Sequence, residues 1–256
     1  MEQKEHGGLG FITGRWPLVK DQSTLVFIHG SGGSAQFWQV QVEDLVERAN
    51  TIAVDLPGHG GSRGAGKDTI EGYAEAIIDF LDTLEAPGPI PCGLSLGGAI
   101  TQQLLLDYAG RFRAGILIGT GAKLKVLPDI IETIENDFLG FVKMIPRFAA
   151  SEKTDRAVIE KFQNELKDCR PDVISGDFKA CNGFNVMARL GEINVPVLVV
   201  SADEDQLTPP KYADYLETAI RHSTRSHILA AGHIVPLEKP QAVNKAISDF
   251  LDDQAL

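Results

Sequence analysis

The sequence predicts an α/β fold, a mostly parallel, doubly wound sheet with a helical cap inserted between two of its strands. Short apolar runs rich in β-branched residues alternate with longer amphipathic stretches, a pattern typical of a parallel sheet covered by helices on both faces. The alternation stops between residues 122 and 191, where helical patterns continue without a convincing strand. The chain has 256 residues, which suits one domain carrying such an insertion.

Seven runs have the length and composition of strands, at residues 11–15, 25–29, 51–55, 90–93, 115–119, 197–201 and 227–230. The stretches between them predict helices at residues 35–48, 69–84, 96–108, 210–219 and 241–251. In residues 69–84, for example, Ile70, Tyr73, Ile77 and Leu81 recur on one helical face. We therefore divide the chain into a core, residues 1–121 and 192–256, and a cap, residues 122–191.

The expected cap is rich in large apolar side chains, since it holds six of the twelve Phe and two of the three Met. This content predicts an apolar substrate pocket, for which we single out Phe138, Phe141 and Met144. The same side chains could instead pack the cap onto itself. The cap also holds four arginines that could either bind a substrate carboxylate or face water: Arg147, Arg156, Arg170 and Arg189.

Composition excludes several classes of function. The formal net charge of −11 disfavours nucleic acid or an anionic membrane as a partner, because both require a basic surface. No apolar run approaches the roughly 18 residues of a membrane helix, and the first residues lack the apolar stretch of a signal peptide. The three cysteines form no CxxC pair, so we expect neither a disulfide framework nor a metal site. We expect a cytoplasmic protein.

The motif GLSLGG at residues 93–98 is the first candidate for chemistry. It reads G-x-S-x-G between a predicted strand and a predicted helix, the setting in which a nucleophilic serine is exposed on a sharp turn. Glycines on both sides let the backbone pack tightly, and the start of the helix favours developing negative charge near Ser95. Ser95 is therefore the predicted nucleophile.

A second glycine-rich loop, HGSGGS at residues 29–34, has two interpretations. It could supply the Ser31 N–H to an oxyanion, with a second N–H from Leu96, and His29 could then line the substrate site. Alternatively, residues 30–35 match G-x-G-x-x-A, and Asp55 ends the next strand 20 residues further on. That spacing is typical of a dinucleotide-binding fold, but this interpretation leaves GLSLGG unexplained.

A general base and its orienting acid are expected after the last strands. His233 follows the apolar run that begins at His227, and a loop beyond a strand's carboxyl end is where a base can reach the nucleophile. Asp203, Glu204 and Asp205 come directly after the strand at 197–201. The chain order of serine, acid and histidine is that of one class of hydrolase, and we predict Asp205 as the acid.

Together these segments resemble α/β-hydrolases over essentially the whole chain, from LVFIHGSGGS and VDLPGHGGS through CGLSLGGA to VLVVSADEDQLTP and AGHIVPLEKP. The resemblance implies Ser95 as nucleophile, His233 as base, Asp205 as acid, and the Ser31 and Leu96 N–H groups as oxyanion donors. It implies no metal and no organic cofactor. A serine in the elbow, instead of an aspartate, sets the chain apart from epoxide hydrolases and haloalkane dehalogenases. The elbow GLSLGG with the small, apolar helix after it is similar to that of enol-lactonases, and the segment DLPGHGGSRG and the chain size are similar to those of carrier-protein methyl esterases.

We therefore expect a serine hydrolase that cleaves small to medium apolar carboxylic esters through an acyl-Ser95 intermediate. An enol-lactonase, a thioesterase or a carbon–carbon bond hydrolase would use the same residues, so these alternatives stay open. The expected partner is a small ester or lactone.

Overall fold

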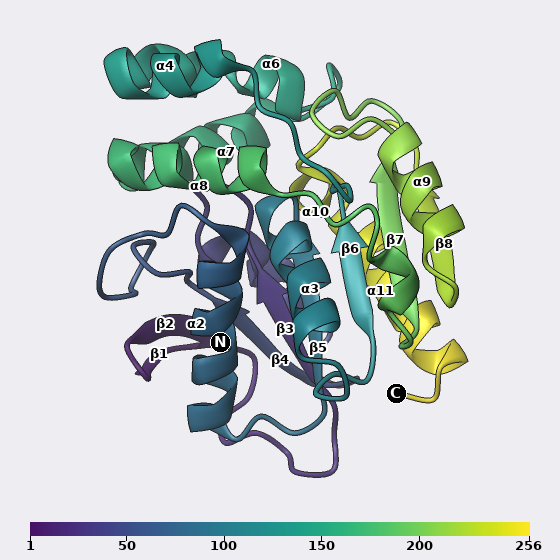
Figure 1. The fold of residues 1–256 in the computed structure, drawn as a ribbon. Coiled ribbons are helices and arrows are strands. Elements are labelled where there is room, and N and C mark those ends of the chain that lie inside the picture. Colours follow the sequence, from purple (N-terminus) through teal and green to yellow (C-terminus); the bar gives the residue numbers. More distant parts are fainter.

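The structure, a computed structural model of residues 1–256, is built around one eight-stranded sheet (Figure 1). The strand order is β1-β2-β4-β3-β5-β6-β7-β8. The pairs β1–β2 and β2–β4 are antiparallel, and every other neighbouring pair is parallel. The predicted α/β fold with a mostly parallel sheet is confirmed. The strands are β1 (Glu2–His6), β2 (Leu9–Thr13), β3 (Thr24–Ile28), β4 (Asn50–Val54), β5 (Pro89–Leu94), β6 (Gly115–Ile118), β7 (Val197–Ala202) and β8 (Ser223–Ile228).

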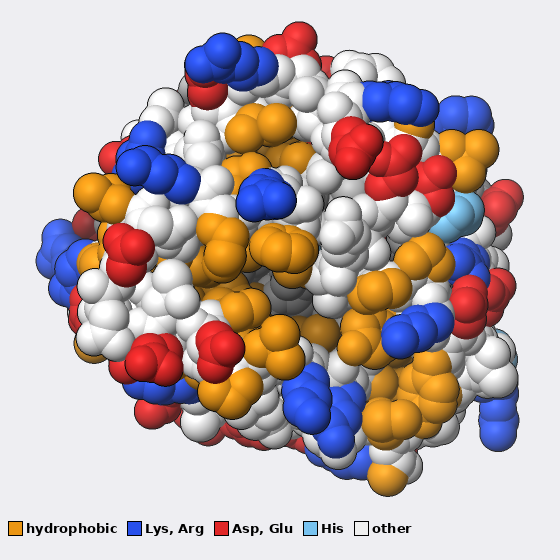
Figure 2. Space-filling model, turned by 90° about the horizontal axis from the view of Figure 1, so that it is seen from above, with side chains coloured by type: hydrophobic (Ala, Val, Ile, Leu, Met, Phe, Trp, Pro, Cys, Tyr) orange, Lys and Arg blue, Asp and Glu red, His pale blue; other side chains and the backbone are white.

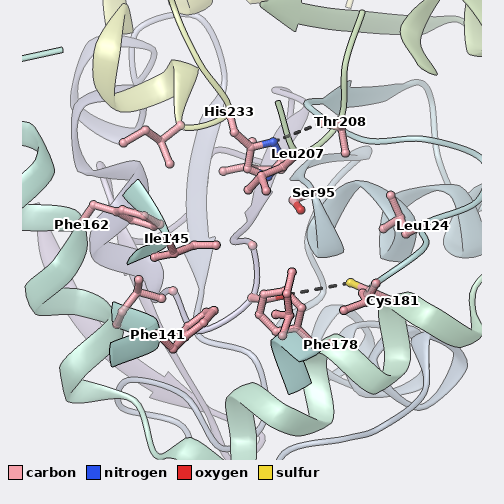
Figure 3. Close-up of a pocket in the computed structure, with 18 of the residues that line it drawn as sticks. Ser95, Leu124, Phe141, Ile145, Phe162, Phe178, Cys181, Leu207, Thr208 and His233 are labelled. Atoms are coloured by element: carbon pink, nitrogen blue, oxygen red, sulfur yellow. Dashed lines mark hydrogen bonds between the residues drawn. The ribbon is translucent and has the colours of Figure 1, made fainter. Parts of the chain in front are cut away.

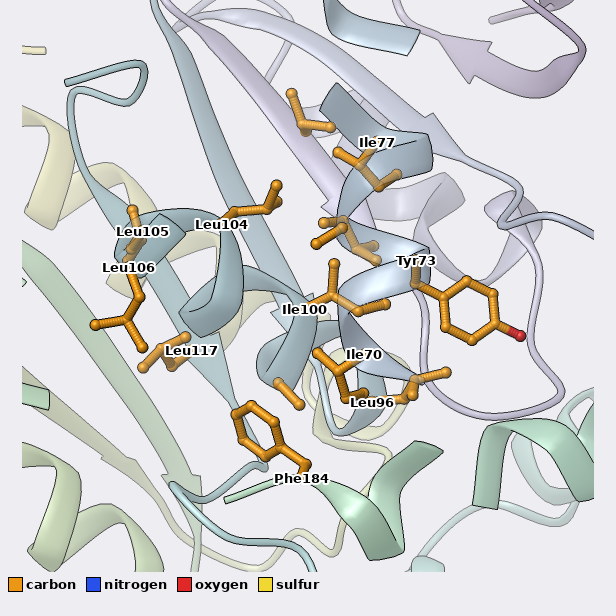
Figure 4. Packing of buried hydrophobic residues seen from close by; sticks show 14 of the residues in the cluster. Ile70, Tyr73, Ile77, Leu96, Ile100, Leu104, Leu105, Leu106, Leu117 and Phe184 are labelled. Atoms are coloured by element: carbon orange, nitrogen blue, oxygen red, sulfur yellow. The ribbon is translucent and has the colours of Figure 1, made fainter. Parts of the chain in front are cut away.

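Helices cover both faces of the sheet and form two separate apolar cores. On one face, α2 (Ile70–Leu84), α3 (Leu96–Asp107) and α9 (Lys211–Ala219) pack against the strands. Figure 4 shows the part of this core around Ile77 of α2 and Ile100 of α3. On the other face, α1 (Gln39–Asp44) and α11 (Pro240–Asp253) pack around Trp38 and Ile247. The short α10 (Val235–Glu238) and the 3₁₀ helices η1 (Ala35–Trp38) and η2 (Leu190–Glu192) complete the core. This two-sided burial is what the continuous apolar strands require.

The segment between β6 and β7 is helical and lies over the carboxyl ends of the parallel strands (Figure 1). It has a small apolar core of its own, centred on Phe141, Leu166 and Ile174. Its only β-type pairing is an isolated bridge between Lys123 and Asn185. The helices are α4 (Pro128–Asn136), α5 (Phe138–Met144), α6 (Pro146–Ala149), α7 (Arg156–Asp168) and α8 (Pro171–Gly183).

The structure corrects the sequence analysis at both edges of the sheet. The sequence predicts the last strand at residues 227–230, but the strand runs from Ser223 to Ile228, and the rest of that apolar run forms a loop. The hairpin strand β1 is not predicted by the sequence at all.

One predicted helix is also shorter than expected. The helix predicted at residues 35–48 is a 3₁₀ turn followed by a helix that ends at Asp44.

Candidate active site

Ser95 lies on a strained turn between β5 and α3. Its φ of 55° and ψ of −113° fall in a region that residues with side chains rarely adopt. The turn is held by Ser95 N, which donates to Ile118 O at 3.0 Å, and by Thr120 Oγ1, which donates to Ser95 O at 2.9 Å. A Cβ at Gly97 would overlap the Ile28 carbonyl, so only glycine lets α3 start this close to β3. The strain is stored where the predicted nucleophile sits.

His233 and Asp205 form a buried pair beyond the ends of β8 and β7. His233 Nδ1 donates to Asp205 Oδ2 at 2.9 Å, which leaves Nε2 free to act as a base. Leu207 N and Thr208 N donate to Asp205 Oδ1, and Thr208 Oγ1 donates to Oδ2 at 2.7 Å. With four donors, this carboxylate is fixed in orientation and keeps the histidine ring in one tautomer.

The electrostatics of the pair favour an ionised acid. Burial by itself raises the pKa of Asp205, but the neighbouring His233 and the hydrogen bonds from His233 and Thr208 outweigh it and leave the pKa below its usual value. The other two candidate acids have different partners. Asp203 Oδ1 accepts from Ala231 N at 3.3 Å, and Glu204 Oε2 accepts from Ser151 Oγ at 2.6 Å. Of the three carboxylates, the structure therefore brings Asp205 to His233.

Ser95 and His233 face one cavity of about 130 Å³ that lies between the cap and the core (Figure 3). Fourteen of its 21 lining residues are hydrophobic, so the cavity favours an apolar ligand. Seen from the cap side, it opens as a hollow rimmed mainly by hydrophobic side chains (Figure 2). The cavity also holds Cys181, but burial raises the pKa of this thiol to about 12, so it carries no thiolate at neutral pH.

Two backbone N–H groups are available beside Ser95. Leu96 is the first residue of α3, so its N–H has no acceptor within the helix. Ser31 N makes no hydrogen bond within the protein, and Ser31 lines the cavity beside Ser95. The structure thus brings together Ser95, His233, Asp205, Ser31 and Leu96, all five residues of the predicted catalytic set.

Only one of the three cap residues singled out for substrate contact lines the cavity. Phe141 does so, whereas Phe138 and Met144 are outside the lining and pack, half-buried, against the apolar core of the cap, with the Phe138 ring 6.5 Å from that of Phe141. Two other cap phenylalanines, Phe162 and Phe178, line the cavity with Phe141. Helical periodicity identifies the buried face but not which of its members reach the opening.

His29 was expected to line the substrate site, and the structure corrects this. The side chain is fully buried and lies outside the cavity lining. Its Nε2 accepts from Leu56 N at 3.1 Å, so the proton is on Nδ1, which donates to Gly30 O at 2.8 Å. Burial and the neighbouring His59 keep the pKa of His29 well below its usual value, so the ring is neutral. His29 holds the glycine-rich loop in place.

The structure argues against dinucleotide binding by residues 30–35. Two of the loop's N–H groups are occupied by carboxylates of the protein itself, since Gly32 N donates to Asp177 at 2.8 Å and Ala35 N to Asp55 at 2.6 Å. The same Asp55, which would have to bind a ribose, is 4% exposed and also accepts from Gly61 N. The glycine-rich segment and Asp55 therefore hold the loop in place by hydrogen bonds within the protein.

The cap arginines lie outside the cavity lining. Arg147 is exposed, and Arg156, Arg170 and Arg189 pair with surface carboxylates. The one lysine or arginine that lines the cavity is Lys125, a residue that no sequence motif indicates. No group of three or more His, Cys, Asp or Glu side chains is arranged to hold a metal ion. No helix has the length and apolar character needed to cross a membrane.

Comparisons with known proteins agree with the fold. The model of the alpha/beta hydrolase family matches residues 25–246. The chain is 27% identical to 3-oxoadipate enol-lactonase 2 of Acinetobacter baylyi over 245 residues, covering 89% of this chain and 88% of that protein. It is 26% identical to pimeloyl-[acyl-carrier protein] methyl ester esterase of Nitrosomonas europaea, covering 82% and 86%. The solved structure of a thermophilic esterase superposes with a TM-score of 0.85 at 30% identity, covering 99% and 97%.

Proposed function

Because the chain belongs to the alpha/beta hydrolase family, we propose that it hydrolyses carboxylic esters with small to medium apolar acyl groups. The observation that carries the proposal is the buried Asp205–His233 pair facing the same apolar cavity as Ser95. The cavity of about 130 Å³ is close to the roughly 150 Å³ of a cavity that binds one benzene molecule. An acyl group of that size would fill it.

The reaction follows from the positions of these groups. Ser95 Oγ attacks the acyl carbon while His233 Nε2 takes the hydroxyl proton of Ser95. The tetrahedral oxyanion accepts hydrogen bonds from the N–H groups of Ser31 and Leu96. The C–O bond to the alcohol then breaks, and His233 returns the proton to the departing oxygen. A water molecule activated by His233 attacks acyl-Ser95, releasing the carboxylic acid and restoring the hydroxyl. Asp205 stabilises the imidazolium in both steps.

Lactone hydrolysis is the second candidate, favoured by the similarity to an enol-lactonase over most of the chain. The chemistry at Ser95 is the same, except that the leaving oxygen stays tethered to the acyl group. Thioesters and carbon–carbon bonds would need the same nucleophile and base. Steady-state rates on matched butyrate esters, lactones and thioesters would rank these substrate classes.

Replacement of the nucleophile tests the proposal directly. Ser95→Ala should lower kcat on p-nitrophenyl butyrate by about 10⁶, the loss seen when a serine protease loses its nucleophile. It should also abolish labelling by a fluorophosphonate probe. Ser34→Ala is the matched control, since Ser34 ends the glycine-rich loop of residues 29–34 and its side chain makes no capping hydrogen bond. Near-full hydrolysis and labelling in Ser95→Ala would show that another residue is the nucleophile.

A further inference from the structure

The cap and the core are joined by one buried carboxylate. Asp177 of α8 is 0% exposed and receives donors from three separate core segments. Gly32 N donates to its Oδ2 at 2.8 Å, His59 Nε2 lies 3.0 Å from the same oxygen, and Tyr73 OH donates to Oδ1 at 2.5 Å. Because each carboxylate oxygen has a partner, the charge is fully satisfied despite its burial.

One of these donors belongs to the turn that carries the proposed oxyanion donor. Gly33 N donates to Gly30 O at 3.1 Å, which closes a four-residue turn with Ser31 and Gly32 at its centre. Gly32 has a φ of 69°, as the third residue of a type II turn requires. The Gly32 N–H belongs to the peptide that follows Ser31, so the bond to Asp177 fixes the plane directly after the proposed donor.

The cap also limits this turn sterically. A Cβ at Gly32 would come within 2.8 Å of Ile174 Cδ1 and 2.9 Å of Leu166 Cδ2, both from cap helices. The turn is therefore enclosed between β3 on one side and α7 and α8 on the other. On the core side, His29 Nδ1 donates to Gly30 O and holds the start of the turn.

The charge state of the contact supports a positioning role. Burial alone lowers the pKa of His59, but the attraction and hydrogen bond of Asp177 dominate and raise it to about 10. A buried ion pair is often no more stabilising than apolar side chains of the same volume. Overall stability therefore gives no strong reason for a carboxylate here, whereas it provides the strong, directional acceptor that the Gly32 N–H needs.

We propose that Asp177 is a positioning residue that orients the Ser31 N–H for the oxyanion, so that the oxyanion hole is complete only when α8 is docked on the core. This inference rests on the proposed esterase function of Ser95. With the cap lifted, Gly32 N loses its acceptor, and the turn keeps only its own Gly33–Gly30 hydrogen bond and the bond from His29. Docking of the cap thus both closes the apolar cavity and aligns the N–H that stabilises the transition state.

Two variants of the same cluster separate positioning from simple stabilisation. Asp177→Ala removes the acceptor of Gly32 N, and Tyr73→Phe removes another donor of the same carboxylate but leaves the Gly32 bond intact. With p-nitrophenyl butyrate, we expect kcat to fall ten- to a hundredfold in Asp177→Ala, less than the 10²–10³ typical of losing an oxyanion donor. The KM should change less than threefold. Tyr73→Phe should keep kcat within about threefold even though its Tm falls.

The affinity for a transition-state analogue is a second measurement, and a change in folding stability alone should not alter it. An apolar trifluoromethyl ketone adds to Ser95 and places an oxyanion beside Ser31, so its binding should weaken in Asp177→Ala by the same factor as kcat. Equal losses of kcat in Asp177→Ala and Tyr73→Phe, or unchanged ketone binding, would overturn the inference. If Asp177→Ala does not fold, amide hydrogen exchange in the unmodified protein decides. The Gly32 N–H should be protected as strongly as the amides of α8, and rapid exchange would refute its bond to Asp177.

The outcome is distinguishable from a failure of the proposed function. If Ser95→Ala keeps hydrolysis and probe labelling, Ser95 is not the nucleophile and the proposed function fails. In that case the Asp177→Ala result says nothing about an oxyanion beside Ser95. If Ser95→Ala is inactive while Asp177→Ala retains full kcat and ketone binding, the proposed function stands and the positioning role of Asp177 is wrong.

Discussion

Folding stability should depend on pH through the buried pair of His59 and Asp177. Both side chains are fully buried, with His59 Nε2 3.0 Å from Asp177 Oδ2. The pKa of His59 is raised from 6.5 to about 10 in the folded protein, so the folded state holds a proton that the unfolded state releases above pH 6.5. A raised pKa stabilises the fold fully below the unfolded value, and this contribution is lost as the pH rises toward 10.

The magnitude follows from the proton difference. Between these two pKa values the folded state binds about one more proton, so the free energy of unfolding should fall by roughly 1.4 kcal/mol per pH unit. From pH 7.5 to 9.5 the contribution of His59 should therefore fall by about 2.5 kcal/mol. Toward pH 9 and above, the buried thiols of Cys92 and Cys181 add to the loss, because burial raises their pKa values and the folded state keeps protons that the unfolded thiols release. The share of His59 is therefore the difference between the parent protein and a variant that lacks His59. Two other buried groups do not contribute in this range. The pKa of His29 is lowered, so it acts below pH 6.5, and burial beside Asp177 raises the pKa of Tyr73 above its usual value of 10.

Urea denaturation at several pH values, followed by fluorescence, measures the slope. His59→Gln and Asp177→Asn should each remove the His59 part of the slope, since the first lacks the titrating group and the second lacks the charge that raises its pKa. His222→Gln is the matched control, because this histidine is exposed and should leave the slope intact. If the parent protein and His59→Gln lose stability equally between pH 7.5 and 9.5, His59 is not charged in the folded state and the reasoning fails.

Two further predictions concern the site itself. Asp205→Asn should lower kcat by about 10⁴ with little change in Tm, as the equivalent change does in a serine protease. Asp203→Asn and Glu204→Gln should each stay within about tenfold of the parent, because their carboxylates bond elsewhere, and a collapse at Asp203 alone would overturn the assignment. In a series of p-nitrophenyl esters, kcat/KM should peak at short to medium acyl chains, since a cavity of about 130 Å³ cannot enclose a long one. A steady rise out to C16 would contradict this.

The sequence predicted the interior of the sheet better than its edges, for a physical reason. Central strands such as β3 and β7 are buried on both faces, so their apolar runs identify them directly. The edge strands β1 and β8 are mostly polar, β1 is exposed and β8 is only partly buried, and neither apolar runs nor strict alternation mark them. The apolar run after His227 placed the predicted last strand too late in the sequence. In the structure Leu229 of that run lies in a loop and is 68% exposed.

The same reasoning explains which site residues the sequence could predict. Ser95, Asp205 and His233 each follow a strand, and the carboxyl ends of parallel strands meet at one edge of the sheet, so their order along the chain predicts their meeting. His29 also follows a strand, but a neutral ring between Leu56 N and Gly30 O has no free nitrogen for a ligand. Position at a strand end indicates where a residue lies, and only its hydrogen bonds decide whether it is available.

Asp177 shows what a sequence can reveal about the cap and where that information ends. Val173, Ile174, Ala180 and Cys181 mark the buried face of α8, and Asp177 lies on that same face. A carboxylate on an apolar helical face needs a buried partner, so the pattern alone indicates an ion pair or a hydrogen-bond network. It does not identify the partners, which come from three core segments between 104 and 145 residues away in the sequence. One of those partners is Gly32, in the turn beside Ser95. Asp177 therefore links cap helix α8 directly to the turn that carries the proposed oxyanion donor.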